Sequence, residues 1–225
     1  PGFWRVFDVI SMIPAVPMIG RLVVVGLGLI GGSFAKGIRE SGLCGEVVGV
    51  DLDAQSRKLA VELGVVDRCE EDLATACRGA DVIQLAVPIL AMERVLELLA
   101  TFDLGDTVLT DVGSAKGNVV RAAKAAFGAM PAHFVPGHPI AGSEQSGVEA
   151  SNAQLFKRHK VILTPLPETD SDALAVVDRL WSALGADVEH MEVERHDEVL
   201  AATSHLPHLL ACGLVDSLAK RNENL

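Results

Sequence analysis

The chain has 225 residues, of which 19 are lysine or arginine and 30 are aspartate or glutamate, so that its formal net charge is −11. This acidic balance, without any block of basic residues, disfavours nucleic acid as a partner, because binding to phosphates depends on clustered positive charge. No uninterrupted apolar run reaches the roughly 18 residues that a membrane-spanning helix needs, and we therefore expect a soluble, cytoplasmic protein without membrane contact.

Residues 1–17 mix apolar side chains with charged residues and two prolines, Pro14 and Pro17. The segment lacks the basic start and the small-residue cleavage site of a signal peptide. Met18 stands directly before the first apolar run. We therefore interpret 1–17 as an N-terminal extension or vector remnant.

A glycine-rich turn follows the first predicted strand, Leu22 to Val25. Gly26-x-Gly28-x-x-Gly31 has the spacing of a dinucleotide-binding turn, in which the glycines allow a tight turn, an open approach to the backbone and close helix packing. The helix predicted from Gly31 to Ser41 would direct its free N–H groups at this turn. A pyrophosphate would then be bound mostly by backbone.

An acidic residue ends the second predicted strand, which covers 47–50. Asp51 lies 20 residues beyond Gly31, where a carboxylate can accept hydrogen bonds from the adenosine ribose and repel a 2′-phosphate. NAD is therefore favoured over NADP. Arg57 lies nearby, and for this reason NADP stays open as an alternative.

Beyond Asp51 the pattern continues to alternate between helix and strand, which is typical of a parallel sheet covered on both faces. We predict an α/β fold of the Rossmann type, with a doubly wound, mostly parallel sheet. Helices are predicted at 54–63, 70–77, 90–100, 116–127 and 174–184, and strands at 65–66, 81–87, 107–112, 133–137, 161–164 and 187–191.

Two segments stand outside this alternation. The first, 137–152, is a long loop, and long loops inside compact domains are often functional. The second begins at Glu192, from where the chain is predicted to be helical to its end, with a kink at Pro207. We place a domain boundary near residue 191, with a nucleotide-binding domain at 18–191 and the start of a helical second domain at 192–225.

Polar clusters follow three of the predicted strands, at 86–88, 111–116 and 137–144. In an open α/β sheet the ligand lies beyond the carboxyl ends of the strands, so these clusters should converge on one crevice. The sequence predicts that the following residues bind the nucleotide there: Gly26, Gly28, Leu29, Ile30, Gly31, Asp51, Val87, Pro88 and Gly113.

At these clusters the chain resembles the prephenate dehydrogenase family, which includes arogenate and cyclohexadienyl dehydrogenases. The resemblance runs from about Met18 to the end of the chain. Its motifs are V-G-L-G-L-I-G-G-S at 25–33, A-V-P at 86–88, D-V-G-S-A-K-G at 111–117, G-H-P-I-A-G-S-E-Q-S-G-V at 137–148 and S-H-L-P-H at 204–208. The first motif is shared by many NAD enzymes, whereas the last two are specific to this family.

The resemblance implies NAD-linked oxidative decarboxylation of prephenate to 4-hydroxyphenylpyruvate, or of arogenate to tyrosine. His138 resembles the family histidine that accepts the proton of the substrate 4-hydroxyl as hydride leaves the ring carbon, a task suited to a neutral imidazole. Ser114 matches a serine that would orient His138 or bind the substrate hydroxyl. A plain turn at Gly-His-Pro is the alternative interpretation.

Four further residues are candidates for substrate binding. His205 and His208 are three positions apart, hence on one helical face, and resemble residues that line the family's substrate pocket. Ser143 and Glu144 lie in the specific loop motif, where Glu144 could gate the pocket or be an ordinary solvated side chain. The alternative interpretation is that both histidines are exposed on a helix surface and bind no substrate.

Family members carry a helical second domain that completes the pocket, supplies an arginine for a substrate carboxylate and forms a homodimer. Here the chain ends at Leu225, inside a polar helical pattern, so we expect a truncated second domain. The apolar residues of that pattern would then lack packing partners. We expect such a chain to bind NAD and to turn over slowly.

Two rival functions stay open. One is a 3-hydroxyacid or 6-phosphogluconate type of dehydrogenase, a class that typically uses a lysine in the following helix. Lys124 is available for that role, but nothing in the sequence marks it. The other is an NAD-binding module without catalysis. The four cysteines, Cys44, Cys69, Cys77 and Cys212, form no C-x-x-C pair, which indicates buried thiols in a reducing compartment and no metal site.

Overall fold

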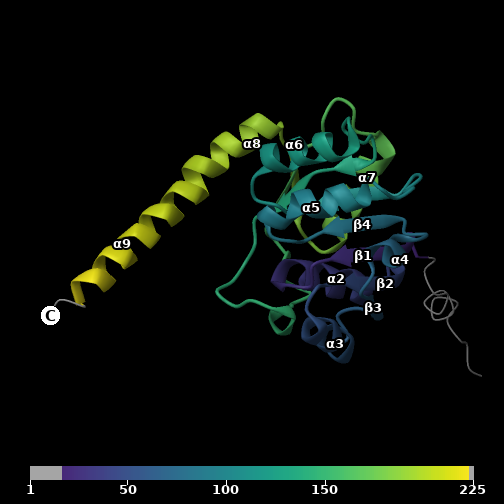
Figure 1. The fold of residues 1–225 in the computed structure, drawn as a ribbon, viewed down its shortest axis with the longest axis horizontal. Helices are drawn as coiled ribbons and strands as arrows, with labels where there is room; N and C mark the ends of the chain where they lie inside the picture. Colours follow the sequence, from purple (N-terminus) through teal and green to yellow (C-terminus); the bar gives the residue numbers. More distant parts are fainter. Residues whose placement is uncertain (1–16, 223–225) are drawn as a thin grey trace, which may run out of the picture.

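A computed structural model describes residues 17–222. The interpretation of the N-terminal extension therefore falls almost wholly outside the described residues. At the centre is a six-stranded sheet in the order β3-β2-β1-β4-β5-β6, in which every neighbouring pair is parallel. The predicted Rossmann-type α/β fold is confirmed (Figure 1).

The chain runs outward from β1 to β3 and then returns to the other side of β1 to begin β4. Its strands are β1 (Ile19–Val25), β2 (Cys44–Val50), β3 (Arg68–Glu70), β4 (Val82–Leu85), β5 (Val108–Asp111) and β6 (Phe134–Val135). The change of direction leaves the ends of β1 and β4 side by side. A crevice at such a switch point is the usual ligand site of this architecture.

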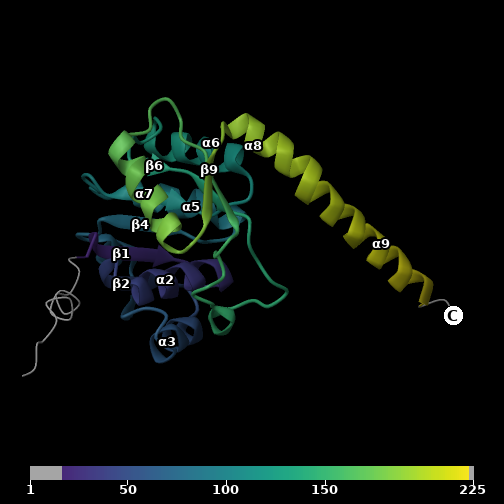
Figure 2. The same ribbon diagram turned by 180° about the vertical axis from the view of Figure 1, so that it is seen from behind.

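Helices cover both faces of the sheet, because the central strands carry consecutive apolar residues and so present apolar side chains on both sides. Side chains such as Leu22 and Val24 pack on one face, and Val23 and Val25 pack on the other. The first face is covered by α2 (Leu29–Ser41), α3 (Ala54–Glu62) and α7 (Ser171–Ala183), and the second by α4 (Leu73–Cys77), α5 (Ile89–Leu99) and α6 (Lys116–Phe127). Figures 1 and 2 show the two layers from opposite sides.

A second, smaller sheet is not foreseen by the sequence pattern. It has the order β7-β8-β9, from β7 (Gly137–Pro139), β8 (Lys160–Leu163) and β9 (Asp187–His190), and β7 is antiparallel to β8. The chain changes sheets at Pro136, which has no N–H for a ladder and whose carbonyl accepts a hydrogen bond from Thr164 N at 2.8 Å. The predicted loop from 137 thus begins only after β7, and η1 (Val148–Ala150) interrupts it.

One predicted strand is wrong. Val65 and Val66 are buried but form a bend, and the strand begins at Arg68 instead. The reason is local: both valine N–H groups donate hydrogen bonds to the Ala60 carbonyl near the end of α3. They are therefore not available for pairing in the sheet. The helix predicted from residue 70 likewise begins later, at Leu73, because the Asp72 side chain caps it.

The C-terminal part of the described chain is one long helical segment. It comprises α8 (Val193–Leu200), the π turn η2 (Ala201–His205) and α9 (Leu206–Asn222). The irregularity expected at Pro207 takes the form of this π turn, because a proline leaves the carbonyl four residues earlier without its donor. Only α8 packs on the body, against α6, and α9 projects away from it (Figures 1 and 2).

This helical segment also corrects the expectation about membrane-spanning length. By length and composition alone, Val193–Lys220 could cross a membrane, although a single such helix is weak evidence. Counting only consecutive apolar residues overlooks it, because serine, threonine and histidine interrupt the run without adding charge.

Candidate active site at the strand ends

The turn after β1 has the geometry that the glycine spacing predicts. Gly26 has a φ of +96°, and a Cβ there would lie 2.5 Å from the Ala86 carbonyl oxygen. A Cβ on Gly31 would lie 2.0 Å from the Gly26 carbonyl oxygen, so α2 can pack this closely on the turn only without a side chain. A Cβ on Gly28 would meet nothing within 4 Å. The backbone at Gly28 is therefore open to a ligand.

The Asp51 carboxylate braces this turn from the end of β2. Its Oδ2 atom accepts a hydrogen bond from Leu27 N at 2.8 Å, and its Oδ1 atom accepts one from Asp53 N at 2.9 Å. Each oxygen keeps a second lone pair for a ligand. Arg57 donates to the carbonyl oxygens of Asp51 and Leu52, so its guanidinium is already engaged with backbone.

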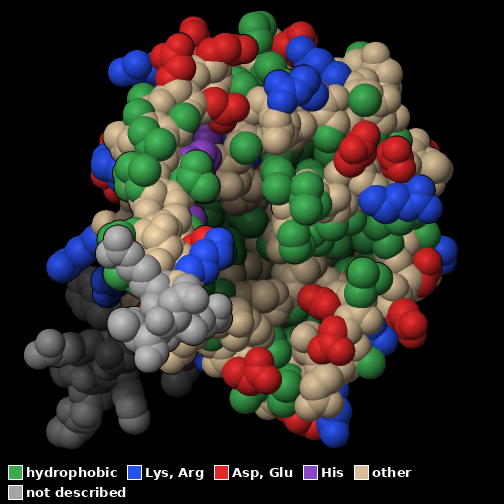
Figure 3. Space-filling model, turned by 60° about the vertical axis from the view of Figure 1, so that its left-hand side comes forward, with side chains coloured by type: hydrophobic (Ala, Val, Ile, Leu, Met, Phe, Trp, Pro, Cys, Tyr) green, Lys and Arg blue, Asp and Glu red, His purple; other side chains and the backbone are tan. Residues whose placement is uncertain are grey.

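Two cavities lie at the carboxyl edge of the sheet, one on either side of Val87. The first, about 420 Å³, is lined by apolar side chains together with Gly26 and Asp51. The second, about 430 Å³, is lined by the glycine turn, the strand ends and the start of β7, with Gly28, Leu29, Ile30, Ala86, Val87, Pro88, Ile89, Val112, Gly113, Ser114, His138, Pro139 and Ala141. Figure 3 shows this face, with apolar side chains around a hollow and histidines at its edge.

A buried ion pair holds β7 against the end of β5. The Lys116 ammonium and the Asp111 carboxylate are both fully buried, and the ammonium donates hydrogen bonds to Asp111 and to the Gly137 carbonyl. Asp111 also accepts hydrogen bonds from Gly113 N at 2.7 Å and from Gly137 N at 3.2 Å. Burial lowers the pKa of Lys116, and the Asp111 carboxylate opposes that change. The backbone before His138 is thereby anchored.

His138 belongs to a chain of three hydrogen-bonding groups. Its Nδ1 atom lies 2.9 Å from Nε2 of His196, and Nδ1 of His196 lies 2.8 Å from Oδ1 of Asp197. Burial lowers the pKa of His138 to about 3, helped by the nearby positive charge of Lys116. Burial also lowers the pKa of His196, against the effect of Asp197. Both imidazoles are therefore neutral at pH 7.

Asp197 has a second contact, at the start of α6. Helix α6 has no side-chain cap of its own, and the two carboxylate oxygens of Asp197 accept hydrogen bonds from Lys116 N and Gly117 N, each at 2.9 Å. Although burial opposes it, these bonds and His196 hold the pKa of Asp197 below its usual range. Helix α8 is thus fastened to the start of α6 by a carboxylate that stays charged.

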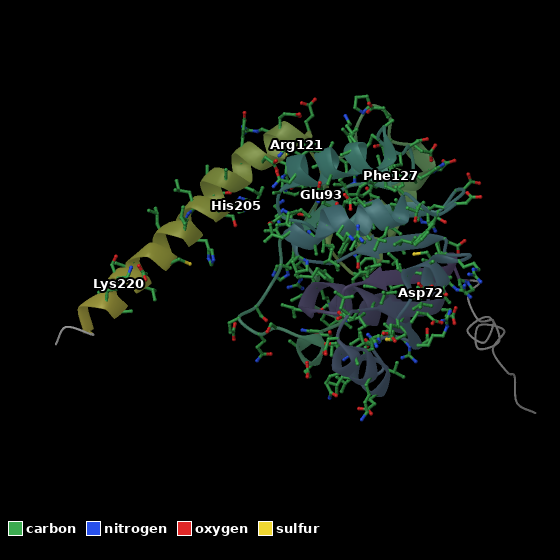
Figure 4. The ribbon with its side chains drawn as sticks, in the orientation of Figure 1. Asp72, Glu93, Arg121, Phe127, His205 and Lys220 are labelled. Atoms are coloured by element: carbon green, nitrogen blue, oxygen red, sulfur yellow. The ribbon has the colours of Figure 1, made fainter. Side chains whose placement is uncertain are left out.

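The structure brings the predicted residues together only in part. His138 and Ser114 line the same cavity as the glycine turn, but His138 is hydrogen-bonded to His196 rather than to Ser114. Ser143 and Glu144 are exposed in the loop after β7 and do not line that cavity. His205 is exposed but close enough to lower the pKa of His138, whereas His208 is paired only with Cys212, at 3.7 Å. Figure 4 places His205 near the root of the projecting helix.

His196, Asp197, Asp111 and Lys116 receive no role in the sequence analysis. One signal in the sequence was the adjacent His196 and Asp197, which precede the motif S-H-L-P-H at 204–208. The other was the pair of opposite charges, Asp111 and Lys116, on either side of Ser114. Among the described residues, no group of three or more His, Cys, Asp or Glu is placed to hold a metal ion.

The thiols differ in burial from what the cysteine spacing suggested. Cys77 is buried, Cys44 and Cys69 are half-buried, and Cys212 is exposed on α9, so the expectation of four buried thiols is wrong for the last. All four are free, and burial raises the pKa of Cys77 to about 12.

Comparison with known sequences places the site in context. A sequence profile described as prephenate dehydrogenase, nucleotide-binding domain, matches residues 34–190. A cyclohexadienyl dehydrogenase of Zymomonas mobilis is 38% identical over 87% of this chain and 66% of its own length. A prephenate dehydrogenase of Bacillus subtilis is 35% identical over 91% of this chain and 55% of its own length. The chain thus spans between about half and two thirds of the length of these relatives.

Solved structures show the same similarity. The crystal structure of prephenate dehydrogenase from A. aeolicus, in complex with hydroxyphenyl propionate and NAD+, has a TM-score of 0.83 and 39% identity, covering 90% of this chain and 70% of that one. The Synechocystis arogenate dehydrogenase has a TM-score of 0.77 and 31% identity, covering 88% of this chain and 69% of that one.

Proposed function

The chain belongs to the prephenate dehydrogenase family, and from this premise we propose that it takes part in tyrosine biosynthesis by the NAD-dependent oxidative decarboxylation of prephenate to 4-hydroxyphenylpyruvate, or of arogenate to tyrosine. The observation that carries the proposal is one cavity lined both by the glycine turn and by His138. A nicotinamide ring and a substrate alcohol have to meet within such a space for hydride transfer.

NAD fits the residues present. The glycine turn and the N-terminus of α2 would bind its pyrophosphate, and the free lone pairs of Asp51 would accept hydrogen bonds from the adenosine ribose. The same carboxylate would repel the 2′-phosphate of NADP. Arg57 offers little compensation, because backbone carbonyls already bind it. When bound, NAD+ supplies the acceptor for the hydride.

His138 would accept the proton of the substrate 4-hydroxyl. As that proton moves, electron density rises on the ring carbon that loses hydride, and release of carbon dioxide then makes the ring aromatic. The neutral imidazole is in the correct state to accept a proton at pH 7. Ser114 faces the same cavity and would bind the substrate hydroxyl.

The remaining substrate contacts are weaker proposals. His205, at the root of the projecting helix, would bind a substrate carboxylate or the ring. His208, Ser143 and Glu144 would have to approach the cavity by movement of α9 and of the loop after β7, because all three are exposed and do not line it.

The division of the chain is also a proposal. Residues 18–191 would form the nucleotide-binding domain and 192–225 the beginning of a helical domain. Six large apolar side chains are exposed on α9: Leu206, Leu209, Leu210, Leu214, Val215 and Leu218. We propose that a second copy of the chain covers them in a homodimer, and that the protein works in the cytoplasm without nucleic acid or membrane.

Nucleotide binding and turnover test this function separately. Calorimetry should show binding of NAD+ and at least about tenfold weaker binding of NADP+, a preference that Asp51→Asn reduces. Formation of NADH at 340 nm, with prephenate or arogenate, should fall at least about 100-fold in His138→Asn without loss of NAD+ affinity. The control is His159→Gln, on an exposed histidine outside the site.

Equal turnover by His138→Asn would overturn the catalytic proposal and favour a module that only binds NAD. Oxidation of a 3-hydroxyacid in place of both cyclohexadienyl substrates would favour the rival dehydrogenase class.

A further inference from the structure

The contacts around His138 join two distant parts of the sequence. His138 lies in β7, whereas His196 and Asp197 lie in α8. His196 is 58 residues further along the chain than His138. The His196 ring is fully buried, and the two imidazoles meet edge to face with centroids 5.1 Å apart. Helix α8 therefore delivers a carboxylate and an imidazole to the inner side of the proposed proton acceptor.

The positions of the protons follow from the chemistry of the three groups. A carboxylate can only accept, so Nδ1 of His196 must carry the proton that bonds to Asp197. A neutral His196 then has a bare Nε2, which can only accept from Nδ1 of His138. The tautomer of His138 that remains has its proton on Nδ1 and a free lone pair on Nε2.

We propose that His196 and Asp197 are positioning residues that hold His138 in the Nδ1–H tautomer and leave its Nε2 as the proton acceptor of the cavity. When Nε2 takes the substrate hydroxyl proton, no other bond changes at the ring. The positive charge that develops on His138 is stabilised through the Nδ1–H bond to His196 and by the Asp197 carboxylate beyond it. This inference rests on the proposed function for the identity of the alcohol.

The charges around the two rings explain why such a carboxylate is needed. Lys116 from α6, His205 from η2 and, in its protonated form, His196 from α8 oppose a positive charge on His138. Asp111 from β5 faces His196 but is already bound by Lys116. Asp197 is the acidic group that favours the protonated form of His138. Without it, an imidazolium beside a buried ammonium would be strongly disfavoured.

A purely structural role for the pair is the competing explanation, because Asp197 also caps α6. Three variants distinguish the positioning of His138 from the capping of α6. His196→Leu removes the acceptor for His138 Nδ1 and leaves both cap bonds in place. His196→Gln can still accept through its amide oxygen. Asp197→Asn retains one cap bond through its amide oxygen but has no charge.

Nitrogen-15 NMR of the histidine rings in the full chain tests the tautomer without substrate. We expect His138 to carry its proton on Nδ1 at pH 7, to keep it there in His196→Gln, and to shift toward the Nε2–H form in His196→Leu. The exposed pair of His190 and Asp178, joined at 2.8 Å, provides the matched control variant His190→Leu. An Nε2–H tautomer of His138 in the unmodified chain would overturn the inference.

Turnover then tests the consequence. We expect kcat to fall about 10- to 100-fold in His196→Leu and Asp197→Asn, with KM for NAD+ unchanged, partial recovery in His196→Gln, and no effect of His190→Leu. Unchanged kcat in His196→Leu would overturn the positioning role. If the unmodified chain oxidises neither prephenate nor arogenate, the proposed function fails, and the tautomer measurement still decides this inference.

Discussion

Most of the surroundings of the His138 imidazole oppose a positive charge on it. Burial lowers its pKa to about 3, with further contributions from Lys116, His196 and His205, and Asp197 opposes them. An ordinary histidine has a pKa near 6.5. The folded chain therefore keeps this ring neutral at a pH where the unfolded chain protonates it.

The pH dependence of stability should reveal this difference. Between about pH 6.5 and about pH 3 the unfolded chain binds the proton and the folded chain does not, so the free energy of unfolding falls as the pH decreases. One proton corresponds to a slope of about 1.4 kcal/mol per pH unit. Urea unfolding of His138→Gln at pH 7 and pH 5 should show a shallower fall, whereas His159→Gln should keep the original slope. Equal slopes in both variants would contradict the depressed pKa.

Two glycines of the turn should respond to alanine in opposite ways. Gly31→Ala forces a Cβ against the Gly26 carbonyl and should cost about 1–3 kcal/mol of unfolding free energy. Gly28→Ala has open space and should change stability by less than about 0.5 kcal/mol. Its methyl group stands where a pyrophosphate would approach, so NAD+ binding should weaken at least about tenfold. Unfolding curves and calorimetry measure the two effects, and tight NAD+ binding by Gly28→Ala would argue against this turn as the nucleotide site.

The residues of the turn were predictable because glycine spacing reports backbone geometry directly. Gly26, Gly31 and Asp51 lie within one strand-helix-strand unit, so local pattern places them. His196 was not predictable, because its partner, His138, is 58 residues away in sequence. Lys116 was missed for a related reason, since only the fold shows that its ammonium is fully buried beside Asp111.

Among the elements, α7 contributes most visibly to the layer beneath the second sheet. Trp181 of α7 packs between Phe34 of α2 and Phe156, with ring centroids 4.5 Å and 4.9 Å away. All three rings are fully buried. The aromatic cluster therefore joins α7 to α2, the helix that follows the glycine turn.

Removing the central ring should loosen both helices. Trp181→Ala should lower the free energy of unfolding by about 3–5 kcal/mol, because it deletes a large buried side chain and leaves a cavity. Arg179→Ala, on the exposed face of the same helix, should change it by less than about 0.5 kcal/mol. Urea unfolding followed by circular dichroism measures both. A loss below 1 kcal/mol for Trp181→Ala would mean that the cluster is not part of the cooperative core.

Element boundaries were predictable where a local signal sets them, as with α6, which begins and ends where expected, at Lys116 and Phe127. Boundaries were not predictable where hydrogen bonds to a neighbouring helix end replace those to a strand. Val65 and Val66 have the composition of a strand, yet their N–H groups close the end of α3. The strand β7, which contains His138, was not predictable for another reason: its partner, β8, lies beyond the intervening loop.

At the scale of the whole molecule, α9 is the part that the body does not support. Every described side chain from Ala201 to Lys220 is exposed, and the described part of the chain does not cover the apolar ones. Figure 1 shows α9 projecting away from the body. Large exposed apolar faces of this kind are usually association surfaces. The alternation of helix and strand in the sequence predicted the parallel sheet, but it could not show where this helix lies, because none of its described side chains packs on the body.

Hydrogen exchange should distinguish the free helix from the covered one. In a dilute sample we expect backbone amides of α9 to exchange much faster than those of β1 and β4, which lie in the middle of the sheet. Raising the protein concentration should slow exchange in α9 if a second copy covers its leucines, while β1 and β4 stay unchanged. Leu210→Glu should abolish that dependence. Exchange in α9 that is independent of concentration would contradict the homodimer.

The placement of His138 in a strand has a consequence for how this scaffold could diversify. Its backbone is held by register with Ile162 and by the Asp111 and Lys116 anchor next to it, and its ring is hydrogen-bonded to His196. The exposed segment at 142–146 that follows is not part of these contacts. We therefore expect insertions or exchanges at 142–146 to leave the position of the proposed acceptor unchanged.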